Sequence, residues 1–138
     1  MNKAILDTDT LSEIGKGKDP AIAGNARTYR RAFGHYTFSV ITVLEIVRGF
    51  QQIHSQPRLN AFLATLPHVE VIPFDQREAE LAGHIAGELH RLGRPIEMAD
   101  TMIAATAITH GLELVTGNTA HHQRIQQIGY PLILVNWR

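Results

Sequence analysis

Cysteine is absent from this chain of 138 residues, and lysine and serine are rare. Without cysteine, neither a disulfide framework nor a thiolate metal site can form. The motifs GxGxxG, GxxxxGKS, GxxxxGKT and GxSxG are also missing, and the chain has only three serines. Enzymes that use these nucleotide-binding loops, and hydrolases with a serine triad, therefore find little support.

Long hydrophobic runs and an excess of charge are missing as well. No apolar run approaches the roughly 18 residues of a membrane span, and the N-terminal run is too short for a signal peptide. We therefore expect a cytoplasmic protein. Lysine plus arginine and aspartate plus glutamate both total 13, so net charge does not indicate nonspecific nucleic-acid binding. Arg27, Arg30 and Arg31 form a local basic cluster that we interpret as a solvated helix face.

Short apolar runs alternate with helical patterns along the whole chain. Strands are expected at 3–7, 35–40, 69–75, 112–116 and 132–135. Helices are expected at 8–14, 20–33, from Thr42 onward, 57–66, 76–92, 98–109 and 119–127. Alternating strands and helices imply parallel pairing with right-handed crossovers. The sequence thus predicts one α/β domain over 1–138, a three-layer α/β/α sandwich with a central, mostly parallel sheet of about five strands.

Polar side chains collect where these strands end. Ligands of such sheets bind outside the carboxyl ends of the strands. Five polar residues are expected at or just past such ends: Asp7, Asp9, Asp75, Thr116 and Asn118. Asp7 and Asp9 flank a single threonine, and one of them can serve as the N-cap of the following helix. We expect only one of the pair to face the crevice, and Asp7 is the better candidate.

Two further acids stand on helices. Asp100 is the only charged residue in the apolar stretch 98–109; it either caps its helix or needs a compensating partner, because an unpaired buried charge is costly. Glu45 lies off the apolar stripe of its own helix. It is either a surface acid, forming a capping box with Thr42 as N-cap, or part of a site.

Taken together, Asp7, Glu45 and Asp100 come from three separate elements and are expected at the same edge of the sheet. Carboxylates brought close together either take up protons or hold a cation. Oxygen ligands without cysteine favour Mg²⁺ or Mn²⁺ over zinc. Such an ion, held by a few carboxylates, is typical of phosphate chemistry.

Four segments resemble those of PIN-domain ribonucleases, and specifically VapC-type toxins of type II toxin–antitoxin pairs. They are "ILDTDTLSEI" (5–14), "FSVITVLEIVRGF" (38–50), "RPIEMADTMIAATAITHGLELVTGNTAHHQRI" (94–125) and "VNW" (135–137). The resemblance implies that Asp7, Glu45 and Asp100 bind the metal. It also places Asn118 where a fourth acid often stands and Thr116 at a hydroxyl position near the acids. Glu97 and Asp9 are further accessory candidates, and His121 and His122 are expected at the surface.

The resemblance implies Mg²⁺-dependent cleavage of RNA phosphodiesters, often in tRNA. It also implies a homodimer, or a complex with a VapB-type antitoxin whose C-terminal segment covers the site. Two alternatives stand beside this reading. A receiver-like phosphoacceptor domain needs a lysine after its last strand; the only lysines, Lys3, Lys16 and Lys18, are all near the N-terminus, so this alternative fails. A catalytically silent PIN-like binding module is favoured only by the amide at Asn118.

Overall fold

Five short parallel strands form the centre of the structure, a computed structural model that describes all residues 1–138. The strands are β1 (Ala4–Leu6), β2 (Thr37–Ser39), β3 (Glu70–Ile72), β4 (Glu113–Val115) and β5 (Leu134–Val135). Every paired strand runs parallel to its neighbour. Each strand lies inside its predicted range but is shorter, because only the central residues of each apolar run pair with a neighbour.

Seven α-helices and one short 3₁₀ segment connect the strands. They are α1 (Thr8–Lys16), α2 (Pro20–Phe33), α3 (Val40–Gln52), α4 (Gln56–Thr65), the 3₁₀ segment η1 (Leu66–His68), α5 (Gln76–Arg91), α6 (Met98–His110) and α7 (Thr119–Gln127). Pro20 occupies the first turn of α2, where its missing N–H costs nothing. Gly111 ends α6 at φ 63°, a left-handed conformation that glycine adopts without strain. These start and stop signals explain why most predicted helix boundaries hold within two residues.

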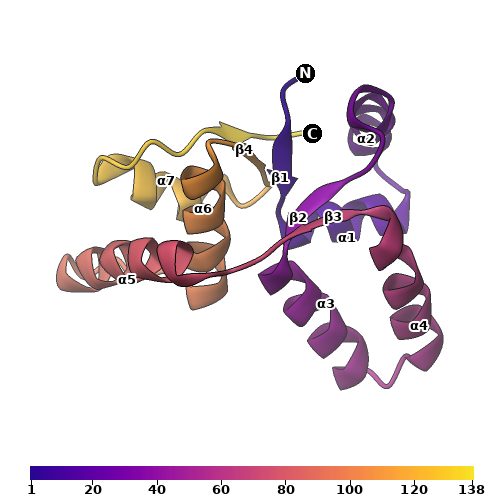
Figure 1. Ribbon diagram of the computed structural model, residues 1–138, viewed down its shortest axis with the longest axis horizontal. Coiled ribbons are helices and arrows are strands. Elements are labelled where there is room, and N and C mark those ends of the chain that lie inside the picture. The colour runs from indigo at the N-terminus through magenta and orange to yellow at the C-terminus, as the bar shows by residue number, and fades with distance from the viewer.

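Strand β1 is buried on both sides, and its side chains divide the core in two. Ala4 and Leu6 pack with residues of α2, among them Tyr29. Ile5 faces the other way, into the core formed by α5, α6 and α7, with Ile85 as one neighbour. Figure 1 shows α1 and α2 on one side of β1 and α5, α6 and α7 on the other. The predicted three-layer α/β/α sandwich is confirmed.

The sheet is interrupted between β1 and β2. Hydrogen-bonded ladders join β1, β4 and β5 in one group and β2 and β3 in the other. A side chain fills the break: the Tyr29 hydroxyl donates to Ala4 O at 3.0 Å and lies 3.1 Å from Thr37 Oγ1. This fully buried hydroxyl links two strands whose backbones do not pair, so the five strands still form one layer.

Helix α3 begins earlier than predicted. Ser39, and not Thr42, is its N-cap, because the Ser39 hydroxyl accepts a hydrogen bond from Ile41 N at 3.0 Å. Thr42 lies inside the first turn, fully buried, 3.0 Å from the hydroxyl of Thr8. The predicted capping box of Thr42 and Glu45 is therefore wrong, and the carboxylate of Glu45 is left for another partner.

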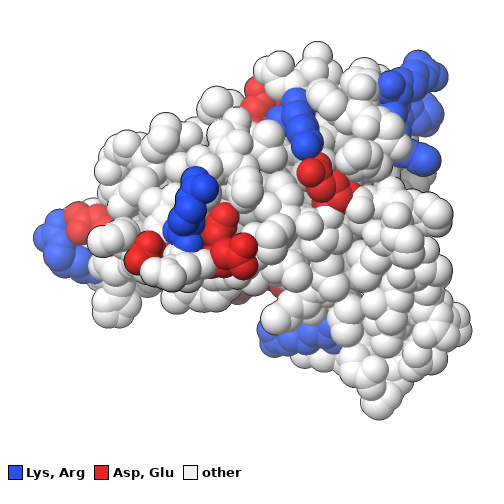
Figure 2. Space-filling view, in the orientation of Figure 1, with Lys and Arg blue, Asp and Glu red and all other residues white.

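Two helical arms extend from the sheet, α5 to one side and the α3–α4 pair to another (Figure 1). The face over α3 and α4 carries few charged side chains, as Figure 2 shows. Large apolar side chains of this segment are also exposed, including Leu44 on α3 at 58% and Ile53 at the end of α3 at 60%. None of the helices is both long and apolar enough to cross a bilayer.

Candidate metal centre

Asp7 is the anchor of the site, directly after β1. It is 3% exposed and is the N-cap of α1. Its Oδ1 accepts a hydrogen bond from Thr8 N at 2.9 Å, and its Oδ2 accepts one from the Thr116 hydroxyl at 2.8 Å. Asp7 N in turn donates to Val115 O at 2.9 Å, which ties the end of β1 to the end of β4. A buried carboxylate is thus held in one orientation from both sides.

Asp100 approaches Asp7 from α6. It lies in the first turn of that helix, where the helix dipole favours an anion, and its side chain is 16% exposed. The surrounding residues Ile103, Ala104 and Ala107 are fully buried, so the helix enters the core just beyond the acid. Asp100 has only long polar contacts, to Asn118 Nδ2 at 3.4 Å and His121 Nδ1 at 3.6 Å. Its carboxylate is held less firmly than that of Asp7.

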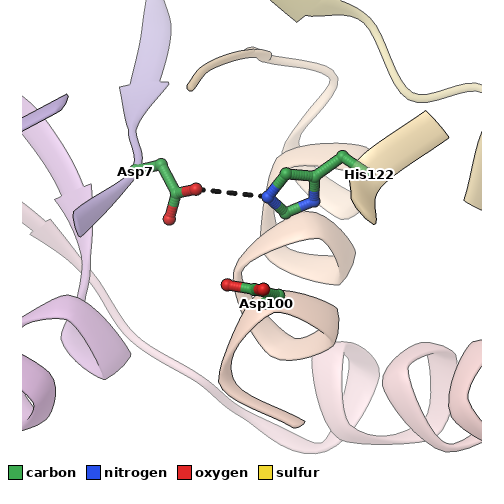
Figure 3. Close-up of side chains that lie close together, drawn as sticks. All are labelled: Asp7, Asp100 and His122. Atoms are coloured by element: carbon green, nitrogen blue, oxygen red, sulfur yellow. Dashed lines mark hydrogen bonds and ion pairs between the residues drawn. The ribbon is translucent and has the colours of Figure 1, made fainter. Parts of the chain in front are cut away.

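His122 completes the cluster, and its predicted surface position is wrong. The side chain is fully buried, and Nε2 lies 3.1 Å from Asp7 Oδ2. One ligand atom each from Asp7, Asp100 and His122 fall within 4.8 Å of one another. Figure 3 shows these three side chains turned toward a common centre from β1, α6 and α7. Sequence spacing contained the signal, because His122 precedes the buried Ile125 by three residues and so shares its helix face.

The turn between β4 and α7 supplies the accessory residues Thr116 and Asn118. The Thr116 hydroxyl donates to Asp7 and accepts from Asn118 N at 3.0 Å. The Asn118 amide contacts Asp100 and lies 3.0 Å from His121 Nδ1. Asn118 therefore sits beside the acids, as expected from the sequence, and brings an amide rather than a charge to that position.

Glu45 lies at the rim of the cluster rather than within it. Its Oε1 accepts a hydrogen bond from the Thr8 hydroxyl at 2.6 Å, and the residue is partly buried. Thr8 follows Asp7 directly, so this contact brings α3 against the start of α1. The structure thus places Glu45 at the predicted edge of the sheet, with Asp7 and Asp100 deeper inside.

Asp9 and Glu97 also lie near this edge. The Asp9 carboxylate accepts from Gly117 N at 2.9 Å and from Thr116 Oγ1 at 3.5 Å. Of the 7–9 pair only Asp7 contributes an atom to the cluster with Asp100 and His122, as expected, whereas Asp9 is exposed and binds the turn at Gly117. Glu97 is the exposed N-cap of α6 and makes no side-chain capping bond.

Comparison with known proteins shows which family this arrangement belongs to. The family model described as "PIN domain" matches residues 4–126. The chain belongs to the PIN-domain family. Within it the chain is VapC-type: it is 33% identical over 131 residues to the tRNA(fMet)-specific endonuclease VapC of Salmonella typhimurium, covering 93% of this chain and 96% of that protein. A Shigella flexneri protein of the same name is 29% identical, with 91% of this chain and 93% of the relative covered.

Solved structures similar to this chain include toxin and antitoxin complexes. The DNA-bound VapBC structure from Salmonella typhimurium superposes with a TM-score of 0.82 at 29% identity, covering 100% of both chains. VapBC-1 from nontypeable Haemophilus influenzae gives a TM-score of 0.77 at 26% identity, with 97% of each chain covered. The likeness extends over the whole domain, including all the elements that carry the acids.

Burial and mutual repulsion raise the pKa values of three acids in this PIN domain. Burial, and then the negative charge of Asp7, raises the pKa of Asp100 above its ordinary 3.8, although His122 and His121 oppose the rise. Burial also raises the pKa of Glu45 above 4.5, and the charges of Asp7, Asp100 and Glu97 add to it. Asp9 follows the same pattern, through burial and then the charge of Asp7. A cation placed between these groups would offset the repulsion.

The donor set of the PIN domain fits a divalent ion. Two carboxylates and an imidazole converge, a third carboxylate stands at the rim, and hydroxyl and backbone N–H groups hold Asp7 from behind. The ring atom Nδ1 of His122 is buried without any hydrogen-bond partner. A buried polar atom without a protein partner indicates surroundings that the protein atoms alone do not complete; the other ring nitrogen, Nε2, is the one that lies beside Asp7.

Proposed function

We propose that this PIN domain is a divalent-metal-dependent endoribonuclease and the toxin of a VapBC-type pair. The observation that carries the proposal is the convergence of Asp7 and Asp100 at the carboxyl edge of the sheet, with Glu45 at its rim. The similarity to proteins named ribonucleases and endonucleases supports the same chemistry.

Asp7, Asp100 and Glu45 would hold the ion, with Mg²⁺ or Mn²⁺ as the expected metal. When bound, the ion supplies an activated water and neutralises charge on the scissile phosphate. The protein's own contribution is orientation. The Thr116 hydroxyl and Thr8 N–H hold Asp7, and the Thr8 hydroxyl turns the carboxylate of Glu45 toward the same edge.

The accessory residues extend this arrangement. The Asn118 amide donates a hydrogen bond to Asp100, and Asp9 accepts one from Gly117 N in the turn. Glu97 adds a negative charge near Asp100. With an amide at Asn118, we propose that one ion binds well, and that a second binds only when a substrate phosphate adds a ligand.

The substrate we propose is RNA, with tRNA the first to test. Two relatives carry the name tRNA(fMet)-specific endonuclease. Such a substrate is met in the cytoplasm, where we expect the protein to act.

A VapB-type antitoxin is the proposed partner. Leu44 is 58% exposed and directly precedes Glu45 on α3, so it offers a partner chain an apolar contact close to the rim of the site. The face over α3 and α4, which carries few charged side chains in Figure 2, suits such a contact. The structural neighbours are themselves VapBC complexes. We expect the protein to occur as a homodimer or in a heteromeric complex with this antitoxin.

The test is cleavage of total tRNA and of an unrelated RNA by the purified protein with Mg²⁺, with Mn²⁺ and with a chelator. We expect cleavage with the metals and none with the chelator. Asp100→Asn should be inactive, and Glu80→Gln on the exposed face of α5 should match wild type. Cleavage that persists in chelator or in Asp100→Asn would refute the proposal.

The second candidate, a silent PIN-like binding module, is favoured by the amide at Asn118. It predicts RNA binding without cleavage at any metal concentration. The same assay, with a gel-shift measurement added, separates the two functions.

A further inference from the structure

We propose that His122 is a direct nitrogen ligand of the bound ion beside Asp7 and Asp100, so that the centre is not one of oxygen ligands alone. This inference rests on the proposed function insofar as the site must hold a divalent cation. It goes beyond that function by naming a ligand that the acidic residues did not suggest and a metal preference that follows from it.

The position of the imidazole is that of a ligand. Its Nε2 lies 3.1 Å from Asp7 Oδ2, and neighbouring ligand atoms of an octahedral ion with bonds of about 2.1 Å stand about 3.0 Å apart. The candidate atoms of Asp7, Asp100 and His122 lie within 4.8 Å of one another. Figure 3 shows the ring turned toward the two acids rather than along the helix surface.

The proton arrangement of the ring permits this role. A neutral imidazole carries its proton on one nitrogen and a lone pair on the other. No hydrogen bond at Nδ1 determines which nitrogen is protonated. With the proton on Nδ1, the lone pair of Nε2 faces the acids and is free to bind a cation. The contact to Asp7 then becomes one between two ligands of the same ion. The Nδ1–H stays buried without an acceptor, a cost that the metal–nitrogen bond has to exceed.

Neighbouring His121 provides a natural contrast. Its side chain is 43% exposed, and its Nδ1 lies 3.6 Å from Asp100 Oδ2 and 3.0 Å from the Asn118 amide. Being solvated and already paired, it is the weaker candidate. The two adjacent histidines therefore allow a matched pair of variants in which one ring is removed at a time.

A nitrogen ligand changes which metal the centre prefers. Mg²⁺ is bound chiefly by oxygen, whereas first-row transition ions accept imidazole readily. We therefore expect Mn²⁺ to bind more tightly than Mg²⁺, and part of that preference to depend on His122. Removing the ring should weaken Mn²⁺ binding by about tenfold or more, and Mg²⁺ binding by less.

The experiment uses Mn²⁺ alone, without RNA, as the probe. Electron spin echo envelope modulation of bound Mn²⁺ reports nitrogen in the first coordination shell. It is recorded on wild type, on wild type labelled with ¹⁵N-histidine, on His121→Gln and on His122→Phe, whose apolar ring suits the buried space. Calorimetric titrations with Mn²⁺ and Mg²⁺ accompany each spectrum. The labelled wild type needs no substitution, so the test stands even where His122→Phe fails to fold.

The expected result is nitrogen modulation in wild type that changes with the ¹⁵N label, persists in His121→Gln and disappears in His122→Phe, with a reduced preference for Mn²⁺. Modulation lost in His121→Gln but kept in His122→Phe overturns the assignment. Bound Mn²⁺ without any nitrogen signal in wild type also overturns the assignment. If Asp100→Asn abolishes that Mn²⁺ binding, the proposed metal-dependent function is unaffected by this result. Mg²⁺ binding without any Mn²⁺ binding in wild type refutes this inference and leaves the metal dependence standing, whereas binding of neither ion refutes both.

Discussion

The two aspartates at the centre differ in how firmly the protein holds them. Asp7 has hydrogen-bond partners on both carboxylate oxygens, at 2.8–3.1 Å. Asp100 has only contacts of 3.4 and 3.6 Å. Removing the charge of Asp7 would disturb several buried partners, whereas removing that of Asp100 chiefly relieves repulsion. Asp100 is therefore the residue at which charge can be tested apart from folding.

We predict that Asp100→Asn abolishes RNA cleavage and leaves the metal-free protein as stable as wild type or more so. The amide keeps the shape but removes a charge that burial and Asp7 disfavour. Cleavage assays and thermal unfolding without metal measure both effects. The exposed Glu80→Gln is the control for loss of one charge, and full activity of Asp100→Asn at normal stability would refute its role.

Asn118→Asp should have the opposite effect on the apo protein. Its side chain contacts Asp100, so a new charge there repels the existing acids and lowers the free energy of unfolding near neutral pH. The same charge should tighten Mg²⁺ binding in the absence of RNA. Calorimetric titration of Mg²⁺ and thermal unfolding provide the measurements.

The control for this variant is Asn60→Asp on the exposed face of α4, which should change neither quantity. Equal Mg²⁺ affinity and stoichiometry in wild type and Asn118→Asp would show that Asn118 lies outside the metal shell.

At the scale of elements, the site is assembled from helix starts. Asp7 is the N-cap of α1, Asp100 lies in the first turn of α6, and Asn118 is the N-cap of α7. The unpaired N–H groups at these starts give each a partial positive charge, which favours nearby carboxylates. The start of α3 matters in the same way, because it sets the position of Glu45 one and a half turns later.

Ser39→Ala should lower the free energy of unfolding by about 1 kcal/mol, the usual cost of removing an N-cap hydroxyl. For a domain of this size that corresponds to a fall in Tm of roughly 3–4 °C. Ser55→Ala is the matched control, because Ser55 is the N-cap residue of α4 but makes no side-chain capping bond. Thermal unfolding of both variants decides the matter; equal losses would show that the Ser39 hydroxyl does not cap α3.

At the scale of the whole molecule, strand order brings the acids together. β1 and β4 are neighbours, so Asp7 and Thr116, more than a hundred residues apart in the chain, meet where the two strands end. Helices α3, α6 and α7 then bring Glu45, Asp100 and His122 to the same edge. The crowding of charge at this edge makes the stability of the domain depend on pH and on metal.

We predict that stabilisation by Mg²⁺ or Mn²⁺ grows as pH rises from about 4 to 7. The raised pKa values of Asp9, Glu45 and Asp100 mean that the folded state binds these protons more tightly than the unfolded chain. Their contribution to stability is present at low pH and lost as pH rises through the raised pKa values. A cation binds the ionised acids and compensates for that loss.

The measurement is the shift in Tm on adding saturating metal at pH 4.5, 6 and 7.5. Asp100→Asn is the comparison, and it should show little metal-induced shift at any pH. A shift in wild type that does not change with pH would contradict the prediction. The pKa values of Glu70 and Glu78 are lowered, so their contribution to the stability of the metal-free protein is lost as pH falls. Comparing samples with and without metal at the same pH cancels this contribution.

The sequence by itself determined the elements and the edge of the sheet at which the acids lie. Alternating apolar runs, caps such as Pro20 and Gly111, and acids at strand ends are local features, and local geometry follows from them. They were enough to predict a three-layer fold and to expect Asp7, Glu45 and Asp100 at one edge of the sheet, and the resemblance to PIN-domain ribonucleases then implied their role as metal ligands.

Only the tertiary structure decided which side chains are buried in the site and which hydrogen-bond partners they have. It buried His122 against Asp7, left Glu45 on the rim bound to Thr8, made Ser39 the cap of α3 and inserted the Tyr29 hydroxyl between β1 and β2. Each of these outcomes depends on a neighbour far away in the chain. The physical reason is that a side chain's burial and hydrogen-bond partner are set by what packs against it, whereas helix and strand patterns report only which way it points within its own element.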